Sequence, residues 1–268
     1  MPSIHADDGV RLEYGAHGDP AGRPVVLLAG FKAAAASWRY QVPALAHAGY
    51  RVLSVDLRGH GLAERPATGV DMARRGKDVA NVLDALDLHR AVLVGGSMGA
   101  STVWSYLSQS AAERVAAAVS VDQTPKMLNT ADWPHGFYGY AEANADTYFA
   151  DGIPETGHGT PLFRRGPRLL RLLRAMKGAE RELSPGELAL LHDHARADWR
   201  PVIAATQLPV LFVAGAESEF WPSSHAAAAA ALAPRGESAV IAHDGHAANI
   251  EQPKAFNAGL LDFLARVG

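Results

Sequence analysis

Ser97 stands in a motif whose residue types and spacing suit nucleophilic catalysis. The motif reads Gly95-Gly-Ser-Met-Gly99, which has the spacing Gly-x-Ser-x-Gly. It follows the apolar run Ala91–Val94, which predicts a buried strand, and a helical segment resumes directly after it. Glycines at such a turn let strand and helix approach each other, and the turn lifts the serine hydroxyl out of the sheet. We therefore interpret Ser97 as a nucleophile.

His246 is the candidate base that would activate this serine. A serine hydroxyl is a poor nucleophile until a base accepts its proton, and that base needs a carboxylate to orient it. When the chain order is nucleophile, acid, histidine, the base comes from a loop after the last strand. His246 fits this order, since it follows Gly245 in a loop after the apolar run 239–242.

The elements that must position these residues alternate along most of the chain. Apolar runs typical of buried strands lie at 24–30, 51–56, 91–94, 116–121, 209–215 and 239–242. With helical segments between them, they predict a mostly parallel sheet with helices on both faces, and ligands bind beyond the carboxyl ends of such strands. From about 125 to 200 the alternation stops. We therefore predict a core built from 1–124 and 201–268, with a helical cap, 125–200, inserted over it.

Together these motifs resemble those of the α/β-hydrolase superfamily over nearly the whole chain. They are Ala29-Gly30-Phe31, Asp56-Leu-Arg-Gly-His-Gly61, Gly95-Gly-Ser-Met-Gly99 and Gly245-His246. The resemblance implies an α/β-hydrolase sheet and a serine–histidine site, but no particular substrate. Family members form the oxyanion hole from two backbone N–H groups, which correspond here to Phe31 and Met98. The family usually has a histidine before Gly30, where this chain has Ala29; the backbone donor of Phe31 survives that change.

The resemblance also bears on the acid that orients His246. The family usually places it in a Gly-x-x-Asp-x-x-x-Pro pattern after the cap, and this chain has Ser218 at the acid's position. A serine cannot carry the charge that holds an imidazolium. Some lactone-cleaving and esterase members, including the zearalenone-hydrolase-like group, have the acid after the strand that follows the nucleophile helix, where Asp122 stands. We predict Asp122 as the acid, with Glu219 and then Glu217 as alternatives.

The predicted cap region holds a basic helical run and several aromatic residues. Arginines and a lysine interleave with leucines at Arg164, Arg165, Arg168, Arg171, Arg174 and Lys177. We expect a cap helix with a solvated basic face, and a role at a membrane surface or with a partner is the alternative. Trp133 and Trp221 are candidates for lining an apolar substrate pocket, with core packing as the alternative.

Composition excludes several other classes of function. The 268 residues include no cysteine, so disulfides, thiol catalysis and cysteine metal sites are excluded. A net charge of −3 gives no indication of a nucleic-acid or anionic-membrane partner. The sequence has no signal-peptide pattern and no apolar run near the roughly 20 residues of a membrane span, so we expect a cytoplasmic protein. We expect no cofactor and no metal, and a second copy of the chain is the macromolecular partner left open.

We predict a cofactor-free serine hydrolase that acts on a small-molecule ester or lactone. Ser97 would attack the carbonyl, His246 would move the proton, Asp122 would orient the histidine, and the N–H groups of Phe31 and Met98 would hold the oxyanion. A serine nucleophile argues against dehalogenase and epoxide-hydrolase chemistry, which uses an aspartate there in this superfamily. Hydrolysis of C–C or amide bonds and perhydrolysis of the haloperoxidase type are alternatives with the same triad. A small-molecule receptor with little turnover is the alternative from another class.

Overall fold

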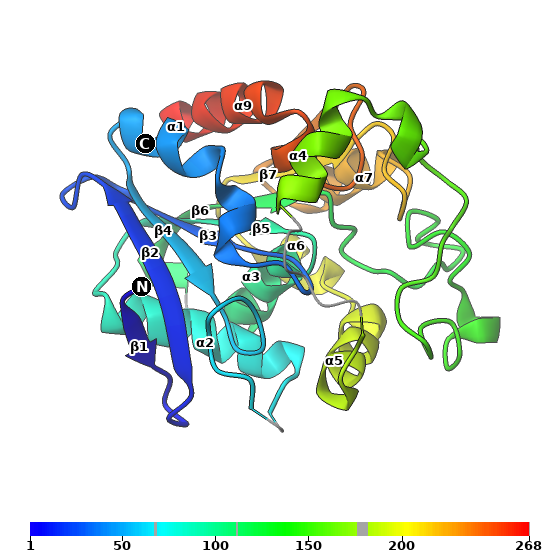
Figure 1. Cartoon of the computed structure of the whole chain (residues 1–268), viewed down its shortest axis with the longest axis horizontal. Helices are drawn as coiled ribbons and strands as arrows, with labels where there is room; N and C mark the ends of the chain where they lie inside the picture. The colour runs from blue at the N-terminus through cyan, green and yellow to red at the C-terminus, as the bar shows by residue number, and fades with distance from the viewer. Residues whose placement is uncertain (67–68, 111, 176–181, 268) are drawn as a thin grey trace.

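The computed structural model describes residues 1–66, 69–110, 112–175 and 182–267 (Figure 1). Its strands are β1 (Ser3–His5), β2 (Arg11–Gly18), β3 (Pro24–Leu28), β4 (Arg51–Asp56), β5 (Ala91–Gly96), β6 (Val115–Val121), β7 (Val210–Gly215) and β8 (Gly236–Ile241). They form one eight-stranded sheet in the order β1-β2-β4-β3-β5-β6-β7-β8. β2 runs antiparallel to β1 and β4, and every other pair of neighbours is parallel. The expected mostly parallel sheet is confirmed.

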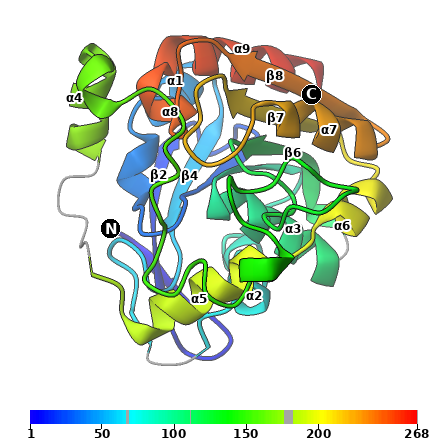
Figure 2. The ribbon, with the colours of Figure 1, turned by 90° about the vertical axis from the view of Figure 1, so that its right-hand side faces the viewer.

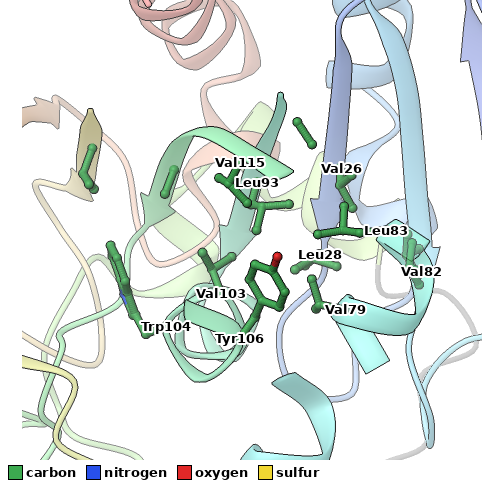
Figure 3. Packing of buried hydrophobic residues seen from close by; sticks show 14 of the residues in the cluster. Val26, Leu28, Val79, Val82, Leu83, Leu93, Val103, Trp104, Tyr106 and Val115 are labelled. Atoms are coloured by element: carbon green, nitrogen blue, oxygen red, sulfur yellow. The ribbon is translucent and has the colours of Figure 1, made fainter. Parts of the chain in front are cut away.

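Helices cover both faces of the sheet, as expected. Those outside the β6–β7 connection are α1 (Gln41–His47), α2 (Met72–Ala85), α3 (Met98–Gln109), α7 (Ser224–Leu232), α8 (Ala248–Glu251) and α9 (Pro253–Arg266). Val26 and Leu28 of β3 belong to a buried cluster with side chains of α2 and α3 (Figure 3). Val25 and Leu27, on the other face, belong to a second cluster with side chains of α1 and α9. Burying each such side chain stabilises the fold by about 1.5–3 kcal/mol, so this alternation fixes which face each strand turns to each helix layer.

Within the described residues, the connection from β6 to β7 carries two α-helices inside the predicted cap region, 125–200, and a third that extends beyond it. They are α4 (Pro167–Ala175), α5 (Pro185–Arg196) and α6 (Arg200–Ala205). α5 begins at a capping box, in which Ser184 accepts the N–H of Glu187 and the Glu187 carboxylate accepts the N–H of Ser184. α4 packs beside α8 and α5 beside α2, so the two helices lie at different sides of the connection (Figure 2). No helix among the described residues is both long and apolar enough to cross a bilayer.

The basic helical run divides its arginines between solvent and core: Arg164 and Arg174 are exposed, as a solvated basic face requires, and Leu172 is 8% exposed. Arg165 and Arg168 bind carboxylates of the core, and Leu170 and Leu173 on the outer side are 57% and 59% exposed. The reason is the acidic surface beneath this segment, because ionised carboxylates attract the guanidinium groups more strongly than apolar surface attracts the leucines. The predicted end of the run at Lys177 lies outside the described residues.

Candidate active site

Ser97 occupies a strained turn between β5 and α3. Its backbone has φ 51° and ψ −129°, a conformation that a non-glycine residue adopts only when its surroundings impose it. The Ser97 N–H donates to the carbonyl of Val121 at 2.9 Å, which ties the turn to the neighbouring strand β6. A Cβ at Gly95 would lie 2.3 Å from the backbone nitrogen of Ala100, and one at Gly99 would lie 2.2 Å from a β3 carbonyl. The turn therefore needs both glycines that the sequence motif supplies.

Two backbone donors lie next to this serine. Within the described residues, the N–H groups of Phe31 and Met98 donate to no protein acceptor. Met98 begins α3, so its N–H belongs to the unpaired first turn of a helix, where negative charge is stabilised. Gly30 brings the other loop close, because a Cβ there would lie only 2.9 Å from the Cβ of Ser97. Both donors are therefore free to bind an anionic oxygen.

Asp122 follows β6 directly and meets His246 across the sheet. The β5–β6 register pairs Gly96 with Val121, so Ser97 and Asp122 follow neighbouring strands at the same edge. Asp122 has φ 43° and its N–H donates to the Val213 carbonyl at 2.7 Å, which turns the side chain toward β7. Its Oδ2 accepts Nδ1 of His246 at 2.8 Å. The structure thus brings together the predicted base and the predicted acid.

The Asp122 carboxylate is fully buried and held by further donors. Oδ1 accepts the Gly215 N–H at 2.9 Å and Oδ2 accepts the Ser218 hydroxyl at 2.7 Å. His225, 1% exposed, places Nε2 3.6 Å from Oδ1. Burial alone would raise the pKa of Asp122, but contacts with His225 and His246 outweigh burial and lower it to about 2. Asp122 is therefore ionised near neutral pH and can stabilise a protonated His246.

The alternative acids Glu219 and Glu217 have other partners. Glu219 accepts the backbone N–H of His246 at 2.8 Å and pairs with Arg165, so it binds the main chain and not the imidazole. Glu217 pairs with Arg168 at 3.2 Å and lies 3.3 Å from Nδ1 of the exposed His243. Of the three carboxylates considered, Asp122 is the one that contacts the His246 ring in this structure.

The Ser97 hydroxyl and His246 are not joined by a hydrogen bond in the described residues. With Nδ1 donating to Asp122, a neutral imidazole presents Nε2 as the acceptor, which is the atom that a serine base uses. Catalytic hydrogen bonds are often long without substrate and tighten when it binds. The arrangement is therefore compatible with proton transfer from Ser97 to Nε2.

Apolar side chains surround the histidine and the oxyanion donors. The rings of Phe220 and Trp221 have their centroids 4.4 Å and 5.3 Å from that of His246. Phe31 packs with Leu191 of α5 in one buried cluster and with Leu190 and Met98 in another. Apolar neighbours of this kind suit an apolar substrate group.

The two tryptophans proposed for the pocket lie in different places. Trp221 contacts the His246 ring. Trp133 packs in the core cluster that includes Ile203, and its Nε1–H donates to Oγ1 of Thr124 at 3.1 Å. In the described part of the chain, Trp221 is therefore the one of the two that contacts a predicted catalytic residue.

Sequence reasoning missed three side chains near the histidine. They are Phe220, His225 and Asp244. His225 is the one ionisable residue of an alanine-rich helix, and its burial against Asp122 could have been suspected from that contrast. Phe220 and Asp244 adjoin motif residues without any pattern that marks them. Among the described residues, no group of three or more histidines, aspartates or glutamates is arranged to hold a metal.

Asp244 is a buried carboxyl group without a hydrogen-bond partner in the described residues. Burial raises its pKa from 3.8 to about 8, and the charges of Glu251 and Asp122 add to that effect. Between pH 3.8 and about pH 8 the folded protein therefore holds a proton on Asp244 that the unfolded chain has released. Folding stability should fall as the pH rises between these two pKa values.

We expect Asp244→Asn to remove this pH dependence, because asparagine is neutral at every pH. Any fixed cost of burying the amide is the same at every pH. The readout is therefore how the Tm difference between variant and wild type changes with pH. Between about pH 5 and about pH 7.5 the folding stability of the variant relative to wild type should rise by more than about 1 kcal/mol, or roughly 2–4 °C in Tm. Thermal unfolding at the two pH values measures it, and a constant Tm difference would contradict the raised pKa.

In a comparison with known protein families, residues 23–253 match the family model described as "alpha/beta hydrolase fold". A non-heme chloroperoxidase from Streptomyces lividans is 37% identical over 132 residues, which is 49% of this chain and 48% of that protein. The chain spans less than half the length of the first curated relatives that it matches.

Two solved structures match over nearly their whole length. The bromoperoxidase from Bacillus anthracis has a TM-score of 0.81 and 28% identity, and the match covers 98% of this chain and 100% of that one. The esterase RhEst1 from Rhodococcus sp. ECU1013 has a TM-score of 0.79 and 25% identity, with 100% and 99% covered. These proteins carry different activities on the same architecture.

Proposed function

This chain belongs to the α/β-hydrolase fold family, and from that premise we propose that it is a cofactor-free serine hydrolase that cleaves a carboxylic ester or lactone. The observation that carries the proposal is the 2.8 Å contact between Asp122 and Nδ1 of His246. That contact lies at the sheet edge where the strained Ser97 turn follows the neighbouring strand. Nucleophile, base and acid are the three parts that acyl transfer requires.

The proposed reaction has an acylation step and a deacylation step. Ser97 Oγ attacks the substrate carbonyl while His246 Nε2 takes its proton, and the oxyanion accepts the N–H groups of Phe31 and Met98. His246 then gives the proton to the leaving alcohol as the C–O bond breaks, which leaves an acyl-serine. Water attacks the acyl group with His246 again as base, and the acid and free serine are released. Asp122 stabilises the imidazolium in both halves.

The surroundings of the site support a neutral substrate with an apolar group. Phe220 and Trp221 pack on the His246 ring, and Leu190 and Leu191 reach the oxyanion donors from α5. We also propose that residues 125–200 act as the cap of this site, since they supply both leucines. Trp133 as a pocket residue remains a prediction.

Perhydrolysis is a second candidate, favoured by the likeness to a chloroperoxidase and a bromoperoxidase. In that reaction hydrogen peroxide replaces water in the second step, and the acyl-serine is released as a peracid. The same catalytic residues serve both reactions, so the difference lies in whether water or hydrogen peroxide attacks the acyl-serine.

The test combines turnover with covalent labelling. Wild type and Ser97→Ala are assayed with p-nitrophenyl acetate and a panel of esters and lactones, and intact mass is measured after treatment with a fluorophosphonate. We expect hydrolysis by wild type, one phosphonyl adduct on wild type and none on Ser97→Ala. Peracid formation when hydrogen peroxide and an ester are supplied together would favour the second candidate. No turnover and no adduct would overturn the proposal and favour a receptor.

A further inference from the structure

Arginine side chains of the segment around α4 contact the loop that carries His246. Arg168 Nη1 donates to the His243 carbonyl, and Arg171 Nη1 donates to the Glu251 carbonyl at 2.6 Å. These two carbonyls lie on either side of His246 in the chain. Figure 2 shows α4 beside α8, which follows that loop. The segment therefore holds the His246 loop at both ends.

Arg165 is the most buried of these contacts. Its side chain is 3% exposed and pairs with Glu219 through Nη2 and with Glu251 through Nη1, the latter at 2.9 Å. Its Nε also donates to the Thr160 carbonyl at 2.8 Å. Removing the Arg165 guanidinium and the Glu251 carboxylate from water is costly, and only well-formed hydrogen bonds offset that cost. The geometry of this cluster is therefore closely defined.

Glu219 extends the cluster to the catalytic loop. One of its oxygens pairs with Arg165, and the other accepts the backbone N–H of His246 at 2.8 Å. Gly245 makes room for this arrangement: a Cβ there would lie 2.5 Å from Glu251 Oε1, 2.8 Å from Arg165 Nη1 and 3.0 Å from Glu219 Oε2. The absence of a side chain before His246 thus lets three charged groups meet at its main chain.

We propose that Arg165 and Glu219 are positioning residues for His246. Arg165, from the predicted cap, fixes the Glu219 carboxylate, and that carboxylate fixes the main chain from which the imidazole reaches Asp122. The docking of the cap segment and the position of the base are then coupled. The role of His246 as the base rests on the proposed function, while the coupling itself is a statement about the chain.

The experiment uses Glu219→Ala, Glu219→Gln, Arg165→Met and the double variant Arg165→Met/Glu219→Ala, each as the full chain. Arg164→Met is the matched control, because Arg164 is the exposed neighbour of Arg165 and its guanidinium lies over the Phe163 ring. Measurements are kcat and KM for an ester, Tm, and deuterium exchange of the peptide that covers 243–251. Arg165→Lys replaces Arg165→Met if loss of the guanidinium prevents folding.

A displaced base should lower kcat with little change in KM, since a shift of about 1 Å in a catalytic group costs up to about 100-fold. We expect Glu219→Ala to lose about 10–100-fold in kcat, and Glu219→Gln less than about 10-fold because its carbonyl oxygen still accepts the His246 N–H. The kcat of the double variant should be no lower than that of the less active single variant, because the effects of residues that act through one contact do not add. Arg164→Met should match wild type.

Deuterium exchange tests the coupling apart from the reaction. Faster exchange of the 243–251 peptide in Glu219→Ala and Arg165→Met, with no change in Arg164→Met, is expected even if the protein hydrolyses none of the esters tried. Absent turnover in wild type would thus count against the proposed function alone. Unchanged exchange in these variants would overturn the positioning role. A lower Tm with kcat unchanged at temperatures below that Tm would do the same. Either result would leave a structural ion cluster.

Discussion

Asp122→Asn is expected to lower kcat by about 10⁴-fold, because an amide in this place cannot stabilise the imidazolium and favours the wrong tautomer of its histidine partner. The variant should still fold, since the oxygen of the introduced amide can accept the Gly215 N–H that now reaches Oδ1 of the aspartate. Kinetics with an activated ester, together with circular dichroism and Tm, would measure both effects.

Matched controls come from the other two carboxylates. Glu219→Gln keeps an acceptor for the His246 N–H, so it should stay within about 10-fold of wild type. Glu217 contacts Arg168 and His243 and not the His246 ring, so its replacement by glutamine should cause no loss of kcat. If Glu219→Gln were crippled and Asp122→Asn active, the acid would lie in the loop after β7 and the assignment would be wrong.

The contact between Asp122 and His246 shows how far local sequence patterns reach. The Ser97 motif and the sheet edge follow from runs of neighbouring residues, so the strand, the turn and the helix could be predicted. The pairing of Asp122 with His246 joins positions 124 residues apart and depends on β7 lying between β6 and β8. The sequence could nominate both side chains but not measure their separation. Ser218 illustrates the limit, because a departure from the family pattern becomes intelligible once its hydroxyl is seen to donate to Asp122.

The basic run around α4 shows where pattern reasoning describes only part of the structure. A stripe of arginines opposite a stripe of leucines has the same period whichever stripe faces the core. The usual rule buries the leucines. Here Glu217, Glu219 and Glu251 lie beneath the segment, so Arg165 and Arg168 turn inward while Arg164 and Arg174 stay exposed. Glu217 and Glu219 come from the loop after β7 and Glu251 from the end of α8; these segments adjoin only in the folded chain, and no window of sequence contains that information.

Removing Ser97 and His246 together should cost no more than removing either one. Ser97→Ala eliminates the acyl-enzyme route, and His246→Ala leaves a serine that nothing deprotonates, so each variant should lose about 10⁶-fold in kcat. The activity that remains, roughly 10³–10⁴-fold above the uncatalysed reaction in water, would come from the N–H groups of Phe31 and Met98, which neither substitution changes.

The measurement is a set of four rates, for wild type, both single variants and the double variant, with one activated ester. Equal losses in all three variants would show that the serine and the histidine act as one unit, as the Ser97 turn and the Asp122–His246 contact at one sheet edge suggest. If the losses multiplied, the two groups would act independently. His246 would then assist some other step, such as product release, and the nucleophile would need a different base.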